Sequence, residues 1–231
     1  MPRDPGGAGL AHEKMRHVFV ETNWVFGYAA PAHHKRLDAV ELLQRSRAGE
    51  VLLHFPTPCL SEVRQPILTK CQPRQEADAV RRFLARARKE ETISSEQDRT
   101  TREVLDRFEK QVLAELRQLD DTLSSIRREP GVEVFPLNGD MLERATSLSD
   151  SGIWLTPFDQ AILAAILVRS EELRHAGELD LCFCEIDADL QPWDKRGGVK
   201  QPLAGLYDEV GLWVYGDFDL RDPVRPDNWP E

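Results

Sequence analysis

The chain has 231 residues, 41% hydrophobic and 30% charged, which is typical of a globular protein large enough to bury a substantial core. Its longest apolar run, residues 161–168, is too short to span a membrane, and residues 1–17 lack the apolar stretch of a signal peptide, so we expect a cytoplasmic protein. The net charge of −10 argues against a protein that coats nucleic acid nonspecifically, although a local groove in an acidic protein can still hold phosphates.

Strand and helix signals alternate in the first part of the chain, after a tail of residues 1–16 that we expect to be flexible. Short β-prone or apolar runs predict the strands, and apolar residues at a helical period predict the helices. The elements expected here are a strand at 17–20, a helix at 33–47, a strand at 51–55 and a helix that begins at Thr57-Pro58.

The middle of the chain predicts an inserted helical arm that covers about residues 74–129. Its first helix is expected at 75–89. Ser94 and Ser95 can cap a longer helix, whose apolar residues recur every three or four positions from Leu105 to Ile126. Such a stripe predicts packing on the neighbouring helix and the sheet, or pairing with another subunit.

The last part of the chain returns to alternating strands and helices. Repeated β-then-α units favour an α/β fold in which helices flank a parallel β-sheet, with residues 17–231 as a single domain. The elements expected here are strands at 132–135, 179–184 and 211–215, and helices at 139–148 and from Thr156-Pro157 onward.

The cysteine and histidine residues give no metal-binding pattern. The four cysteines form no C-x-x-C pair and have no histidines at ligand spacing, so we expect reduced, partly buried thiols and no zinc site. His33 and His34 are expected to open the helix at 33–47, with no role as ligands.

Acidic residues follow the expected strand ends. Because ligands bind at the carboxyl ends of strands in open α/β sheets, we expect these carboxylates to meet in space. Clustered carboxylates repel one another unless protons or cations neutralise them, and such oxygen ligands suit Mg²⁺ or Mn²⁺. The residues concerned are Glu21, Glu62, Asp159, Asp187 and Asp189.

Most of these acids also have a simpler structural explanation. Asp159 completes a capping box with Thr156, and Glu62 by itself reads as a solvated helix residue. Asp187 and Asp189 could form a turn, although in extended chain they would point the same way. Glu21 has no evident structural task, since it lies between a buried strand and a helix cap.

Four segments resemble, in order, the motifs of PIN-domain proteins. They are 17–26, 55–63, 156–165 and 184–190, within a resemblance that covers roughly 17–70 and 132–216. The chain departs from the family pattern at Glu21, where the family has Asp, and at Glu185, where it usually has a small hydroxyl residue. An added methylene moves a carboxylate by more than the ~0.5 Å that a catalytic site tolerates, unless the backbone compensates.

The resemblance implies a metal-dependent endoribonuclease that hydrolyses phosphodiester bonds of single-stranded RNA, for which a toxin-like or defence role is plausible. Asn23 would orient the first carboxylate, and Mg²⁺ or Mn²⁺ would activate a water molecule. RNA is the implied partner, an inhibitory protein is a further one that the toxin-like role would bring, and a second copy of the chain could pair through the apolar stripe of the arm. The implied metal ligands are Glu21, Glu62, Asp159, Asp187 and Asp189, the first four of them catalytic.

Two other functions stay open. The chain could be a catalytically silent PIN-like module that binds RNA or protein, or a Mg²⁺-dependent phosphatase or phosphotransferase that uses the same acids. In the nuclease interpretation, Arg81, Arg82 and Arg88 on the first arm helix would bind phosphates, whereas a solvated basic face is the simpler explanation.

Overall fold

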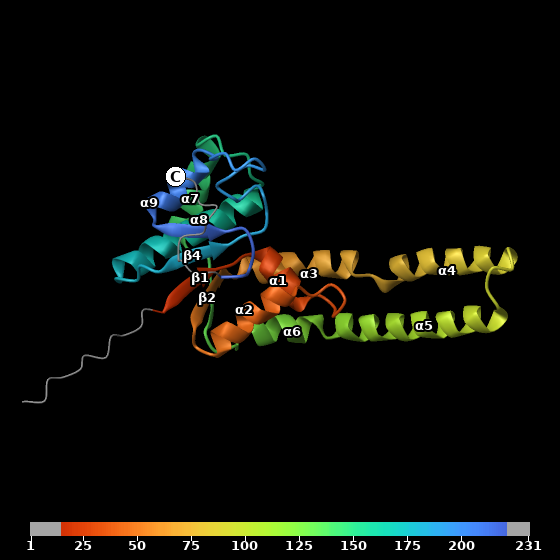
Figure 1. Cartoon of the computed structure of the whole chain (residues 1–231). Helices are drawn as coiled ribbons and strands as arrows, with labels where there is room; N and C mark the ends of the chain where they lie inside the picture. The colour runs from red at the N-terminus through yellow and green to blue at the C-terminus, as the bar shows by residue number, and fades with distance from the viewer. Residues whose placement is uncertain (1–14, 221–231) are drawn as a thin grey trace, which may run out of the picture.

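The structure, a computed structural model, describes residues 15–220, so all but the end of the tail expected at 1–16 lies outside the described residues. Its centre is a five-stranded, all-parallel sheet with the order β3-β2-β1-β4-β5, flanked by helices (Figure 1). The predicted α/β class is therefore confirmed. The strands are β1 (Arg16–Phe19), β2 (Val51–Pro56), β3 (Val132–Phe135), β4 (Leu181–Cys184) and β5 (Leu212–Tyr215).

The strands are short and apolar because helices cover the sheet. In the register of the sheet, Val18 of β1 lies opposite Leu53 of β2 and Cys182 of β4, and all three residues are fully buried. Parallel sheets with both faces covered favour such continuous apolar runs. Strand β4 begins at Leu181, later than predicted, and Leu179 is exposed.

Six helices outside the arm, within residues 15–220, form the body of the protein together with the sheet. The apolar centre of α8, residues 163–167, is fully buried and supplies much of the core. None of the helices described is both long and apolar enough to cross a bilayer. The six are α1 (Thr22–Ala29), α2 (Leu37–Arg47), α3 (Pro58–Lys70), α7 (Gly139–Asp150), α8 (Pro157–His175) and α9 (Leu203–Glu209).

Helix α2 begins at Leu37, so the prediction that His33 and His34 open this helix is wrong. The backbone of Arg36 is extended, and its N–H donates to the carbonyl of Gly27, 2.9 Å away. The Arg36 side chain packs so closely on Gly27 that a Cβ there would lie 3.0 Å from Arg36 Cδ. This contact holds the preceding residues in a turn.

The arm consists of α4 (Pro73–Lys89), α5 (Ser95–Arg117) and α6 (Leu119–Ile126). Figure 1 shows α4 and α5 extending side by side away from the body of the protein. The single long helix expected after Ser95 is interrupted at Gln118. The interruption lets α6 pack against the body, where Leu119, Leu123 and Ile126 join the core.

Candidate functional site

A pocket of about 320 Å³ opens beyond the carboxyl ends of β1 and β4, between α1, α3 and α8. The fold brings four of the predicted acids, from four different elements, to this one place. The residues that line the pocket are Glu21, Thr22, Asn23, Phe26, Glu62, Pro66, Lys70, Asp159, Asp187 and Leu190.

Glu21 lies at the start of α1 and is only 6% exposed. Its Oε1 accepts the N–H of Asn23 at 2.7 Å, so Glu21 is the N-cap of α1, and the expectation that it has no structural task is wrong. Burial raises the pKa of Glu21 to about 8, the Asn23 N–H opposes the rise, and the charges of Glu62 and Asp187 add to it. Without a cation, the carboxyl therefore keeps its proton at neutral pH.

Glu185, which follows β4, is a second buried carboxyl that was not among the predicted site residues. Its Oε1 accepts the N–H of Asp187 at 2.5 Å, whereas its Oε2 is buried and has no hydrogen-bond partner among the described residues. Burial, and then the charge of Glu21, raise the pKa of Glu185 well above its ordinary value. Its sequence signal was an acid directly after a buried strand, the same signal that identified Glu21.

Glu62 and Asp159 face the pocket from α3 and α8. A short hydrogen bond from Thr22 Oγ1 holds Glu62. Burial raises the pKa of Glu62, the bond from Thr22 lowers it, and the charge of Asp159 raises it. Asp159 accepts from Thr156 Oγ1 at 2.7 Å and donates its own N–H to that oxygen at 3.2 Å. Thr156 is therefore the N-cap of α8 with Asp159 as its hydrogen-bond partner, and Asp159 also lines the pocket.

Asp187 and Asp189 differ in position. Residues 188–190 form a turn, in which the N–H of Leu190 donates to the carbonyl of Asp187 at 3.1 Å, so the turn predicted as one alternative for Asp187 and Asp189 is confirmed. Asp189 is exposed, is not among the lining residues, and donates its N–H to Asp187 Oδ1 at 2.9 Å.

The Asn23 side chain lies near Glu21 and Glu185 and lowers the pKa of both.

Lys70 is the one cation among the residues that line the described pocket, and sequence reasoning missed it. It is exposed, and its ammonium lies 5.9 Å from the centre of the Phe26 ring. The signal was a spacing of four residues on α3, because Glu62, Pro66 and Lys70 share one helix face. A cation beside carboxylates suits a substrate that carries negative charge.

The pocket offers the donors that a hard divalent cation requires. Its acidic side chains supply oxygen ligands, and the unpartnered Oε2 of Glu185 lies buried next to them. Their oxygens do not form a compact set, since the one group of three ligand atoms within 4.8 Å of one another, among the described residues, is elsewhere. Mg²⁺ commonly keeps several waters and uses only one or two carboxylates, so spaced carboxylates suit it.

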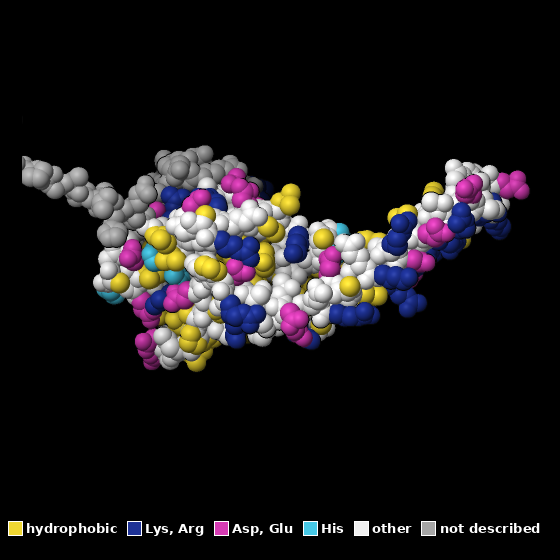
Figure 2. Space-filling model, turned by 90° about the horizontal axis from the view of Figure 1, so that it is seen from below, with side chains coloured by type: hydrophobic (Ala, Val, Ile, Leu, Met, Phe, Trp, Pro, Cys, Tyr) yellow, Lys and Arg dark blue, Asp and Glu magenta, His cyan; other side chains and the backbone are white. Residues whose placement is uncertain are grey.

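The predicted RNA-binding arginines of the arm are not equivalent. Arg81 binds Glu109 at 2.7 Å and Asp106 at 2.9 Å on α5, so it holds the two arm helices together and does not face solvent as a free cation. Arg88 donates to the carbonyl of Ile93 at 3.2 Å, and Arg82 is exposed. Figure 2 shows basic side chains along the arm, interspersed with acidic ones.

The four cysteines are free and buried, as expected. Comparison of the chain with protein-family models, curated proteins and solved structures finds no match.

Proposed function

We propose that this chain is a PIN-like nuclease that hydrolyses phosphodiester bonds of single-stranded RNA with Mg²⁺ or Mn²⁺. The observation that carries the proposal is the single pocket to which Glu21, Glu62, Asp159 and Asp187 all contribute. The order of the four sequence segments and the parallel sheet are consistent with it.

In this proposal the acids divide the work of holding a cation. Glu62, Asp159 and Asp187 are partly exposed and would provide the ligands nearest to the substrate. Glu21 is buried and would provide a further ligand on the side of the cation that faces the protein core. The metal would activate a water molecule and stabilise the leaving oxygen. Lys70, at the edge of the pocket, would contact a phosphate of the RNA.

The buried carboxyls have a defined part in this arrangement. Cation binding would favour the ionised form of Glu21, so it would release a proton from this group at neutral pH. The hydrogen bond from Thr22 holds the Glu62 carboxylate, and the Asn23 N–H holds that of Glu21. These contacts position the ligands before the cation arrives.

The test compares Asp187→Asn with Asp189→Asn, a matched control because Asp189 is exposed and outside the pocket. We expect Asp187→Asn to reduce Mn²⁺-dependent cleavage of a fluorescent single-stranded RNA at least about a hundredfold. Asp189→Asn should cleave at the wild-type rate, and both variants should retain the wild-type circular dichroism spectrum. Full activity in Asp187→Asn would show that the active site is elsewhere.

A second candidate, a catalytically silent RNA- or protein-binding module, is favoured by the deep burial of Glu21 and Glu185. A site occupied by two protonated carboxyls can be stable without a cation. In that case the wild-type chain would bind single-stranded RNA in a gel-shift assay, with or without Mn²⁺, and would leave it intact. Cleavage that is lost in Asp187→Asn would exclude this candidate.

A further inference from the structure

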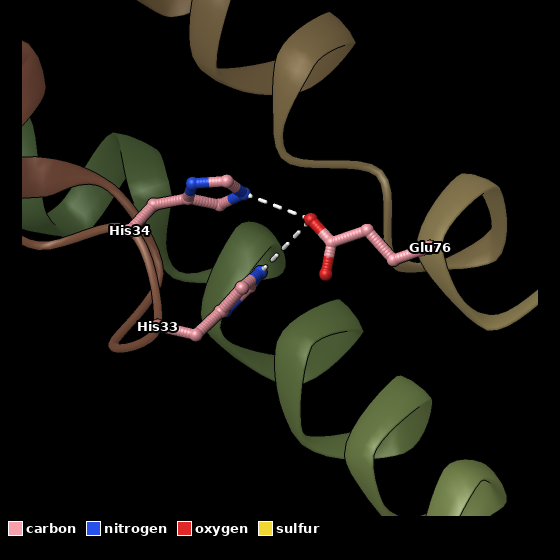
Figure 3. A group of neighbouring side chains, drawn as sticks. All are labelled: His33, His34 and Glu76. Atoms are coloured by element: carbon pink, nitrogen blue, oxygen red, sulfur yellow. Dashed lines mark hydrogen bonds and ion pairs between the residues drawn. The ribbon is translucent and has the colours of Figure 1, made fainter. Parts of the chain in front are cut away.

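The base of the arm contains a second group of side chains with ligand chemistry, apart from the carboxylate pocket. His33 and His34 lie in the turn between α1 and α2, where the N–H of His34 donates to the carbonyl of Pro31 at 2.8 Å. Successive side chains diverge in extended chain, but this turn directs both imidazoles toward Glu76 of α4 (Figure 3). The side chains of two neighbouring residues, His33 and His34, therefore face the side chain of Glu76, which is distant in the sequence.

The two imidazole rings converge on one carboxylate oxygen of Glu76. His34 Nε2 lies 3.1 Å and His33 Nε2 lies 3.8 Å from Oε1 of Glu76. In the described part of the chain this is the group whose three ligand atoms all lie within 4.8 Å of one another. Phe108 of α5 meets the His33 ring edge-on, with the ring centres 4.9 Å apart, and so supports its orientation.

We propose that His33, His34 and Glu76 form a zinc site. Two imidazole nitrogens and a carboxylate suit Zn²⁺ and similar transition metals, whereas Mg²⁺ prefers oxygen ligands alone. Zinc–ligand bonds of about 2.0 to 2.2 Å in a tetrahedron place the ligand atoms roughly 3.3 Å apart. The two distances to Oε1 of Glu76, 3.1 and 3.8 Å, bracket that value, and the ligand nitrogens of His33 and His34 lie within 4.8 Å of each other, so modest side-chain movements would admit the ion.

The site has room for a fourth ligand. The side chains of His33, His34 and Glu76 are 24%, 34% and 46% exposed, so water can reach the remaining coordination position. Cys71, at the end of α3, is buried near Glu76, and burial and then the charge of Glu76 raise the pKa of its thiol. The Cys71 sulfur is not part of the compact group of ligand atoms.

Zinc at this position would fasten the arm to the body of the protein. His33 and His34 belong to the body, and Glu76 belongs to the first turn of α4. The turn between α1 and α2 already contacts α5, because the N–H of Ala32 donates to Glu115 Oε2 at 2.7 Å. A metal bond would add to this connection, so zinc should act on the stability of the arm and leave the chemistry of the carboxylate pocket unchanged.

The experiment is calorimetric titration of the untagged full-length chain with ZnCl₂, followed by Co²⁺ titration monitored by visible absorption. We expect one tightly bound zinc ion per chain, besides any that enters the carboxylate pocket at higher concentration, and an affinity for the tight ion weakened at least about tenfold by His34→Ala or by Glu76→Gln. His175→Ala is the matched control, since His175 is an exposed histidine at the end of α8. That variant and Asp187→Asn should bind zinc as the wild type does.

The stability of the protein provides a second measurement. Zinc at about one hundred times the wild-type dissociation constant should raise the Tm of the wild type by roughly 5 to 10 °C and that of Glu76→Gln by at most about half as much. Wild-type affinity in both His34→Ala and Glu76→Gln would overturn the proposal. So would loss of zinc binding in Asp187→Asn alone, because the ion would then occupy the carboxylate pocket.

Discussion

Replacement of Glu21 by Gln should stabilise the metal-free protein. Gln keeps a carbonyl oxygen that can accept the Asn23 N–H, so the cap of α1 survives while the carboxyl that must take up a proton on folding is removed. The variant is nearly isosteric, and Glu21 is only 6% exposed, so the change acts mainly through charge. Buried carboxyls that serve ligand binding commonly reduce stability in this way.

The size of the effect follows from the pKa of Glu21, which burial raises from 4.5 to about 8. Between pH 4.5 and pH 8 the carboxyl is ionised in the unfolded chain and protonated in the folded one. The contribution of Glu21 to the free energy of unfolding is therefore fully present below pH 4.5 and is lost as the pH rises from 4.5 through 8. At about 1.4 kcal/mol per pKa unit, the loss is about 3 kcal/mol at pH 7. Because Glu62 and Asp187 share the repulsion, we expect Glu21→Gln to recover about 2 kcal/mol at pH 8.

Urea unfolding of both proteins with EDTA, at pH 5 and at pH 8, measures this difference. The advantage of Glu21→Gln should be small at pH 5, grow at pH 8, and shrink when saturating Mn²⁺ stabilises the wild type alone. A variant that is equally or less stable than the wild type at pH 8 without metal would refute the argument from burial.

Two further predictions concern surface and buried charges. Arg82→Glu should weaken binding of single-stranded RNA and lower the slope of log affinity against log salt by about 0.7, as measured by fluorescence anisotropy. An unchanged salt slope in this variant would exclude a phosphate contact at Arg82. Arg81→Ala should instead chiefly destabilise the arm, because Arg81 binds Glu109. Hydrogen bonds from His54 and Arg169 outweigh burial and lower the pKa of Glu133 to about 2. Glu133 is partly exposed, so Glu133→Gln should lower the free energy of unfolding by only about 1 kcal/mol at pH 7, and this difference should vanish as the pH falls from 4.5 through 2; equal stability at pH 7 would contradict the prediction.

Local patterns in the sequence were sufficient to predict the α/β class and much of the candidate site. Apolar runs and helical periods depend on neighbouring residues, so they located the strands and most helices. Since parallel strands share one edge at their carboxyl ends, the acids that follow them could be assigned to one pocket. The contact between Thr156, the N-cap of α8, and Asp159 was also readable, because the two residues are three apart in the chain.

Features that depend on packing between distant segments required the tertiary structure. The interruption at Gln118 accompanies the packing of α6 on the body, and Arg81 is neutralised by residues of another helix. The turn at His33 is closed by hydrogen bonds to Pro31 and is followed by the packing of Arg36 on Gly27, and only the position of α4 brings Glu76 to it. Burial likewise decided the protonation of Glu21 and Glu185, since desolvation is set by everything that surrounds a carboxyl group and not by the residues next to it in the chain.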